Sequence, residues 1–135
     1  MRVIFKKDEV AFEQLHCAIE LFFAQRFIPA ITMAGASEEI YGKTVTLRGY
    51  RNSQNLVWDF YFLRGRPTGK IEKQVRDAGN RVRNGLKHGA EGTIEFNPKL
   101  EAFLLITRTI ENYLRLGKTK TDLMHQFREA TRNVG

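Results

Sequence analysis

Apolar residues recur at helical spacing near the start of the chain. Phe12, Leu15 and Ile19 follow one another at steps of three and four. Asp8 precedes them, and Asp is one of the residue types that favour the helix N-cap. The pattern therefore predicts a long amphipathic helix over residues 8–26, with Asp8 as its N-cap.

A second helix is predicted over residues 30–41. Residues 27–29 form a short corner before it, in which Pro29 suits a first helical position. Gly42 follows it and suits a helix end. Several residues of this helix are small enough to let neighbouring helix axes approach closely, so we expect it to be central and tightly packed. They are Ala30, Ala34, Gly35 and Ala36.

Two glutamates, Glu38 and Glu39, follow the small residues on the predicted second helix. An amphipathic helix presents one face to the core, and adjacent residues point in different directions. We therefore expect one of the two carboxylates to face the interior or a neighbouring basic side chain.

The middle of the chain has less regular patterning. Residues 43–52 lack a helical period and predict an irregular connection or lid. Residues 53–63 fit either a short helix capped by Ser53 or a strand, and the pattern leaves both open. The Gly and Pro content of residues 64–69 indicates a turn or loop.

A further helix is predicted over residues 70–88, closed by Gly89 and Gly92. Residues 93–96 read as a short extended segment. Apolar positions in the predicted helix recur at steps of three and four, the period of one helix face. They are Ile71, Val75, Ala78, Val82 and Leu86.

Two helices are predicted in the last third of the chain. Asn97 and Pro98 suit the N-cap and first position of a helix that ends near Gly117. A shorter helix is expected over residues 122–131, followed by a frayed tail at 133–135. The predicted fold is all-α, an antiparallel helical bundle of four or more helices with one elaborated loop and at most a very short strand.

The composition agrees with one helical-bundle domain over residues 1–135. The hydrophobic share is 42% and the aromatic share 11%, enough for a real core. No apolar run approaches the roughly 20 residues that a membrane span needs. The first residues lack the apolar stretch of a signal peptide. The sequence therefore predicts no membrane association and a cytoplasmic protein.

Neither a metal nor a nucleotide cofactor is expected. Cys17 is the one cysteine, and it reads as a small core residue. The three histidines lie far apart in sequence, without metal-ligand spacing. His16 and His125 sit among apolar positions and read as boundary residues. The chain contains neither of the glycine-rich phosphate-binding patterns, GxGxxG and GxxxxGK[ST].

Positive charge is concentrated in the centre of the chain. Residues 43–88 contain eleven Lys or Arg and three acidic residues, a net charge of +8 in a chain of net charge +7. Such a segment attracts polyanions, since phosphate contacts supply the sequence-independent part of nucleic-acid affinity. The alternative is a solvated basic face that only aids solubility. The residues predicted to bind RNA are Arg48, Arg51, Arg64, Arg66, Lys70, Lys73, Arg76, Arg81 and Lys87.

Aromatic residues are interleaved with arginines in the same segment. Bases of single-stranded nucleic acid stack on aromatic side chains, so this set could clamp RNA. Core or dimer contacts are the alternative reading. The aromatic residues are Tyr50, Trp58, Phe60, Tyr61 and Phe62.

One local pattern contains residue types that can catalyse a reaction. Asn84 and His88 lie four residues apart and so share one face of the predicted helix, and Arg83 can reach the same edge. His transfers protons near neutral pH, Arg stabilises the extra negative charge on a reacting phosphate, and Asn can hold a hydroxyl or orient the imidazole. This set suits metal-independent cleavage of RNA by its own 2′-hydroxyl.

The sequence Arg83-Asn84 followed by His88, in a small helical chain, resembles the HEPN superfamily. The signature of that superfamily is an Arg and a His with four to six residues between them, often with Asn after the Arg. The resemblance implies a helical bundle that acts as a homodimer. It also implies a metal-independent endoribonuclease of toxin–antitoxin or defence systems, with an antitoxin partner. Arg83 and His88 are then the catalytic residues and Asn84 their support, at one composite site between two copies.

The sequence also fits a function of a different class, without enzymatic activity. The chain would then be a non-enzymatic all-α interaction or oligomerisation module, because many superfamily members bind or scaffold without cutting. Its small-residue helix and aromatic segment would form an oligomer interface, and its basic face would bind nucleic acid or an acidic partner. A DNA-binding regulator is less favoured, because no helix-turn-helix spacing with a basic recognition helix is found.

Overall fold

The computed structural model describes residues 1–49, 81–87 and 92–132. Among them it contains five helices and no strand. They are α1 (Lys7–Phe23), α2 (Phe27–Leu47), α5 (Arg81–Lys87), α6 (Pro98–Arg115) and α7 (Asp122–Ala130). The expected all-α bundle of four or more helices is confirmed. No helix in these residues is long and apolar enough to cross a membrane.

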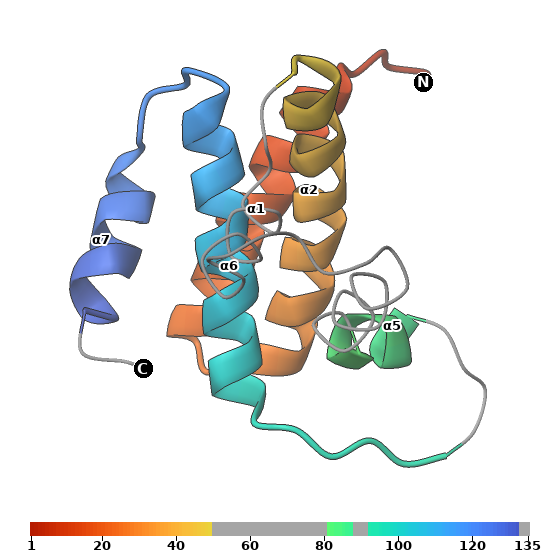
Figure 1. The fold of residues 1–135 in the computed structure, drawn as a ribbon, viewed down its shortest axis with the longest axis vertical. Helices are drawn as coiled ribbons and strands as arrows, with labels where there is room; N and C mark the ends of the chain where they lie inside the picture. The colour runs from red at the N-terminus through yellow and green to blue at the C-terminus, as the bar shows by residue number, and fades with distance from the viewer. Residues whose placement is uncertain (50–80, 88–91, 133–135) are drawn as a thin grey trace, which may run out of the picture.

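The four longer helices lie side by side, and α5 lies against α2 (Figure 1). Helices α1 and α2 are antiparallel, and the Ser37 hydroxyl of α2 donates a hydrogen bond of 2.6 Å to the Ala11 carbonyl of α1. Helices α2 and α6 run in the same direction, from the lower to the upper end in Figure 1. Helix α7 then returns along α1 and α6. The bundle thus joins two antiparallel pairs through a parallel contact.

The hydrophobic core is continuous through the bundle. At one end, an aromatic cluster joins three helices, with the ring of Phe22 5.2 Å from the rings of both Phe27 and Phe127. The edge-to-face geometry of these pairs is the one that aromatic rings prefer. Such contacts between helices supply most of the stability of a helical bundle, because isolated helices of this length are marginal in water.

Helix α2 is the central element, as its small residues predict. It contacts α1, α5 and α6. Ala30, Ala34 and Gly35 are buried, whereas Ala36 is half-buried. The Thr109 hydroxyl of α6 lies 3.3 Å from the Ala34 carbonyl. This short separation between side chain and backbone requires the close approach of helices that small residues allow.

The predicted end of α2 at Gly42 is wrong, because the helix continues to Leu47. The first part of the segment predicted to be irregular is therefore helical. The hydroxyls of Thr44 and Thr46 donate to the backbone carbonyls four residues earlier, and Val45 is fully buried. Packing here outweighs the weak helical pattern. The glycine that ends the helix is Gly49, with φ +82°.

The start of α1 also differs from the prediction. The N-cap is Lys6, which makes no side-chain capping bond, and Asp8 lies inside the first turn. There its carboxylate is close to the positive end of the helix dipole and forms an ion pair of 3.4 Å with Lys118. Helix α1 ends at Phe23, three residues before the predicted end. The corner predicted at residues 27–29 is wrong, because α2 begins at Phe27 and the turn lies at residues 24–26, where Gln25 has φ 61°. Pro29 is the third residue of α2 rather than the first.

The two helices predicted in the last third of the chain are confirmed. The Asn97 side chain accepts a hydrogen bond of 3.1 Å from the Leu100 amide, and Pro98 is the first residue of α6. Gly117, with φ +77°, follows the end of this helix. Helix α7 begins at Asp122, and its N-cap is Thr121. Residues 92–97 are neither helix nor strand.

Several predictions lie outside the described residues. They concern residues 50–52 of the connection, the two readings of residues 53–63, the loop at 64–69, the first eleven residues of the helix over 70–88, Gly89, and the tail at 133–135. The last part of that helix is observed, as α5.

Candidate functional site

The pattern that resembles the HEPN signature begins on α5. Val82 is 4% exposed and belongs to the core, and Leu86 packs against the core at partial exposure. These two residues, four apart, fix one face of α5 against the bundle. Asn84, between them in sequence, is exposed. Helix α5 therefore presents Asn84 to solvent while its apolar face holds it in place.

The structure places only part of the predicted catalytic set. Arg83 and Asn84 lie on consecutive positions of α5. His88 directly follows the last residue of α5 and lies outside the described residues. The predicted convergence of the three side chains therefore stays a prediction.

Gly85 has a packing role that its sequence position does not reveal. A Cβ at residue 85 would lie 2.6 Å from the δ-methyl carbon of Ile94. The missing side chain thus lets Ile94, in the segment 92–97, lie directly against α5. A second contact supports this arrangement, because the Arg81 guanidinium donates a hydrogen bond of 3.0 Å to the Glu95 carbonyl. Together they fix the position of α5 next to the residues that lead into α6.

The predicted RNA-binding residues fall into two groups. Arg48 caps the end of α2 and is exposed, and Arg81 is exposed at the start of α5. Lys87 is the last residue of α5. The others, and the aromatic residues predicted to stack with bases, lie outside the described residues. The basic residues outside are Arg51, Arg64, Arg66, Lys70, Lys73 and Arg76; the aromatic residues are Tyr50, Trp58, Phe60, Tyr61 and Phe62.

A buried polar cluster lies between α2 and α6. Glu38 is 5% exposed, and its Oε1 lies 3.9 Å from the Arg108 Nη2. Asn112, one turn further along α6, is fully buried. Both Glu38 and Asn112 lie within 4 Å of the position that a Cβ on Gly42 would take. The cluster therefore gathers a carboxylate, a guanidinium and an amide at one point of a helix pair.

The sequence predicted part of this cluster. One glutamate of α2 was expected to face the interior or a basic neighbour, and Glu38 does both. Arg108 and Asn112 were not predicted. They lie four residues apart and so share one helix face, which is the one signal that could have marked them.

His16 lies at the boundary of the core, as predicted. It is half-buried, with Nδ1 2.8 Å from the Phe12 carbonyl and Nε2 3.0 Å from the Thr121 hydroxyl. The Thr121 oxygen also accepts a hydrogen bond from the Met124 amide. The imidazole thus links α1 to the N-cap of α7, a structural role. His125 is exposed on α7, and Cys17 is half-buried rather than a fully buried core residue.

Two tyrosines form a buried pair near the polar cluster. The rings of Tyr41 and Tyr113 lie 5.7 Å apart, and the Tyr113 hydroxyl donates to the Thr119 carbonyl at 2.5 Å. Burial, and secondarily the neighbouring Tyr113, raise the pKa of Tyr41 above its ordinary value of 10.0. Burial also raises the pKa of Tyr113. Both side chains are therefore neutral structural groups at physiological pH.

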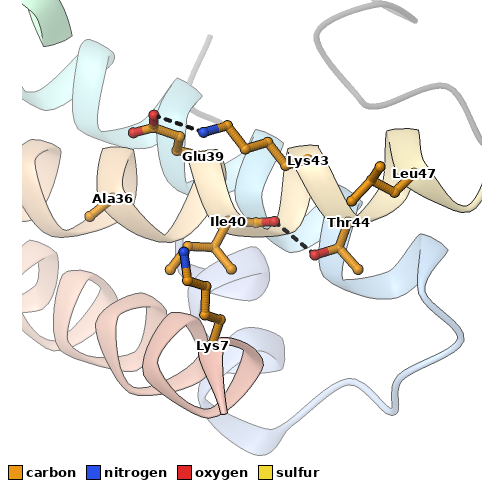
Figure 2. Close-up of a pocket in the computed structure, with 7 residues that line it drawn as sticks. All are labelled: Lys7, Ala36, Glu39, Ile40, Lys43, Thr44 and Leu47. Carbon is orange, nitrogen blue, oxygen red and sulfur yellow. Dashed lines mark hydrogen bonds and ion pairs between the residues drawn. The ribbon is translucent and has the colours of Figure 1, made fainter. Parts of the chain in front are cut away.

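A groove of about 450 Å³ lies between the start of α1 and the C-terminal half of α2 (Figure 2). Its apolar lining comes from Ala36, Ile40 and Leu47 of α2. Lys7 of α1 and Lys43 of α2 add positive charge. The groove is separate from α5 in sequence and was not predicted, because it depends on how two helices meet.

The described residues contain no group of three His, Cys, Asp or Glu side chains placed to hold a metal ion. Comparison with family models, curated proteins and solved structures finds no match for this chain. The physical properties of the residues, and the resemblance carried by Arg83, Asn84 and His88, therefore carry the functional argument.

Proposed function

We propose that this chain is a HEPN-like RNA-binding protein that cleaves RNA without a metal ion, as a homodimer. The observation that carries the proposal is the placement of α5. Val82 anchors this helix in the core while Asn84 stays exposed. A motif that acts on a polymer must lie on a fixed and accessible element, and α5 meets that requirement for Asn84.

The proposed chemistry uses the 2′-hydroxyl of RNA as the nucleophile. His88 of one copy removes its proton as the 2′-oxygen forms a bond to phosphorus. The bond from phosphorus to the 5′-oxygen breaks, and His88 of the second copy protonates that oxygen. Arg83 stabilises the added negative charge on the phosphate, and Asn84 orients the reacting hydroxyl. The products are a 2′,3′-cyclic phosphate and a 5′-hydroxyl.

RNA binding is assigned to the basic segment over residues 43–88. Its net charge of +8 gives a salt-dependent attraction to phosphates. The resemblance further suggests a role in a toxin–antitoxin or defence system, where an antitoxin partner would restrain the nuclease.

The test is cleavage of an end-labelled structured RNA in excess EDTA. We expect the wild-type protein to cut, and Arg83→Ala and His88→Ala to lose at least a hundredfold in rate, as the loss of an acid–base or charge-stabilising group does. The matched controls are Arg26→Ala and His125→Ala, which remove exposed side chains of the same types elsewhere. A protein that leaves the RNA intact, with and without EDTA, would contradict the nuclease proposal.

A second candidate is a non-enzymatic interaction module. The groove between α1 and α2 favours it, because an apolar hollow with charged residues at its edge is typical of protein-binding surfaces. A variant that no longer cleaves RNA but still binds a partner protein through the groove would separate the two functions.

A further inference from the structure

The groove between α1 and α2 has the properties of a site for a helix of another protein. Its apolar residues lie on α2 at positions 36, 40 and 47, which share one helix face. We propose that this groove binds an acidic amphipathic helix of a partner protein. The proposal concerns a surface other than α5 and does not depend on ribonuclease activity.

The apolar part of the groove is open to contact. Ile40 packs against the core and also lines the groove. Leu47, the last residue of α2, lines the groove and is 87% exposed. The segment before the lining residue Lys7 carries three further exposed apolar side chains, Val3, Ile4 and Phe5. A partner that covers these groups removes apolar surface from water, which is the main driving force of protein association.

Charge determines which partner fits. Lys7 and Lys43 line the groove, and Lys6 and Arg48 are exposed on the same two helix ends. Glu39 is the one acidic residue among the described lining residues, and it forms an ion pair of 3.6 Å with Lys43. The charged lining residues Lys7, Lys43 and Glu39 thus have a net charge of +1, and the first turn of α1 also carries Asp8 and Glu9. Carboxylates on a bound helix would meet opposite charge, which favours encounter and specificity.

Shape and apolarity favour a protein helix over other anionic partners. An RNA backbone would contact the lysines but would leave the aliphatic side chains of Ile40 and Leu47 without a matching surface. A helix with Leu or Ile at steps of three and four can place those side chains in the groove while its acidic residues reach Lys7 and Lys43.

The experiment selects a binding helix and then locates it. A displayed library of 16-residue acidic helices, with varied Leu, Ile and Phe on one face, is selected on the wild-type protein. The best peptide is then synthesised with a fluorophore and measured by anisotropy. We expect dissociation constants in the micromolar range, weakened at least fivefold by Lys7→Gln and at least tenfold by Leu47→Ser.

Matched controls test the location. Arg26→Gln and Ile28→Ser alter exposed residues at the opposite end of α2 and should leave the affinity unchanged. A peptide with Ser in place of its apolar residues should not bind. All variants are compared by thermal unfolding, so that a misfolded variant is recognised.

Three results would overturn the proposal. The first is that no library member binds below about 100 μM. The second is that the control variants weaken binding as much as Leu47→Ser does. The third is that sedimentation shows a wild-type dimer that Leu47→Ser converts to monomer, since the occupant would then be a second copy. Failure of RNA cleavage would leave all three measurements unaffected, so the two proposals are tested separately.

Discussion

Ile94 packs directly on Gly85, with its δ-methyl carbon 2.6 Å from the place where a Cβ would lie. A glycine inside a helix costs about 0.5–1 kcal/mol relative to alanine. Glycine is present at position 85 despite this cost because Ile94 occupies the space that a Cβ would take. The contact connects α5, which carries the proposed catalytic motif, to the residues that enter α6.

We expect Gly85→Ala to be coupled to Ile94. In the wild-type background the gain in helix propensity is offset, because the Ile94 side chain must move. In the Ile94→Val background, which removes the δ-methyl group, the same substitution should stabilise the protein by about 0.5–1 kcal/mol. Urea unfolding of the four proteins measures the coupling. Equal effects of Gly85→Ala in both backgrounds would show that the contact is unimportant.

Removal of the buried Glu38 carboxylate should destabilise the fold. Glu38→Ala removes the carboxylate that lies against the guanidinium of Arg108, which is 18% exposed, in the α2–α6 interface. Loss of one member of a buried ion pair typically costs several kcal/mol, and we expect about 2–4 kcal/mol here because the two groups are 3.9 Å apart. Chemical denaturation measures this loss. The control, Glu13→Gln on the exposed face of α1, should change stability by less than about 0.5 kcal/mol.

The tyrosine pair predicts a loss of stability in alkali. The pKa of Tyr41 is raised in the folded state, so the unfolded state loses its phenolic proton first as the pH rises. The stabilisation that comes from burying neutral Tyr41 is therefore complete below pH 10 and decreases as the pH rises above 10. Absorbance at about 295 nm should show that Tyr41 and Tyr113 ionise only as the protein unfolds. Tyr41→Phe should flatten the pH dependence above pH 10, and an unchanged profile would refute this account.

The Asp8–Lys118 ion pair predicts a smaller loss of stability at acidic pH. Burial raises the pKa of Asp8, but Lys118 and the Glu9 backbone amide outweigh it, so the pKa lies below the ordinary 3.8. The pair therefore stabilises the fold above about pH 4 and loses its effect as the pH falls through the lowered pKa. Because both groups are partly exposed, Asp8→Asn should cost less than about 1 kcal/mol at neutral pH. The difference from wild type should disappear at pH 2, and 1 M NaCl should reduce it at neutral pH.

Local signals in the sequence predicted the boundaries of α6 well. The Asn97-Pro98 start and the Gly117 end of α6 were predicted because a cap, a proline and a glycine act on the few residues around them. The end of α2 was misplaced by one and a half turns. Gly42 is a helix-ending residue by type, but it is buried in the α2–α6 interface, where a Cβ would meet Asn112 and Glu38 at ordinary contact distances of 3.6 and 3.8 Å.

The sequence by itself determined the all-α class, the small-residue character of α2, the basic centre of the chain and the Arg83, Asn84 and His88 pattern. These properties depend on composition and on spacing along one segment. Only the tertiary structure decided which distant residues meet. Glu38 lies beside Arg108, which is 70 residues further along the chain, Ile94 packs against Gly85, and Lys7 and Leu47 line one groove. Such pairings depend on how helices pack against one another, and no local pattern encodes which distant surfaces meet.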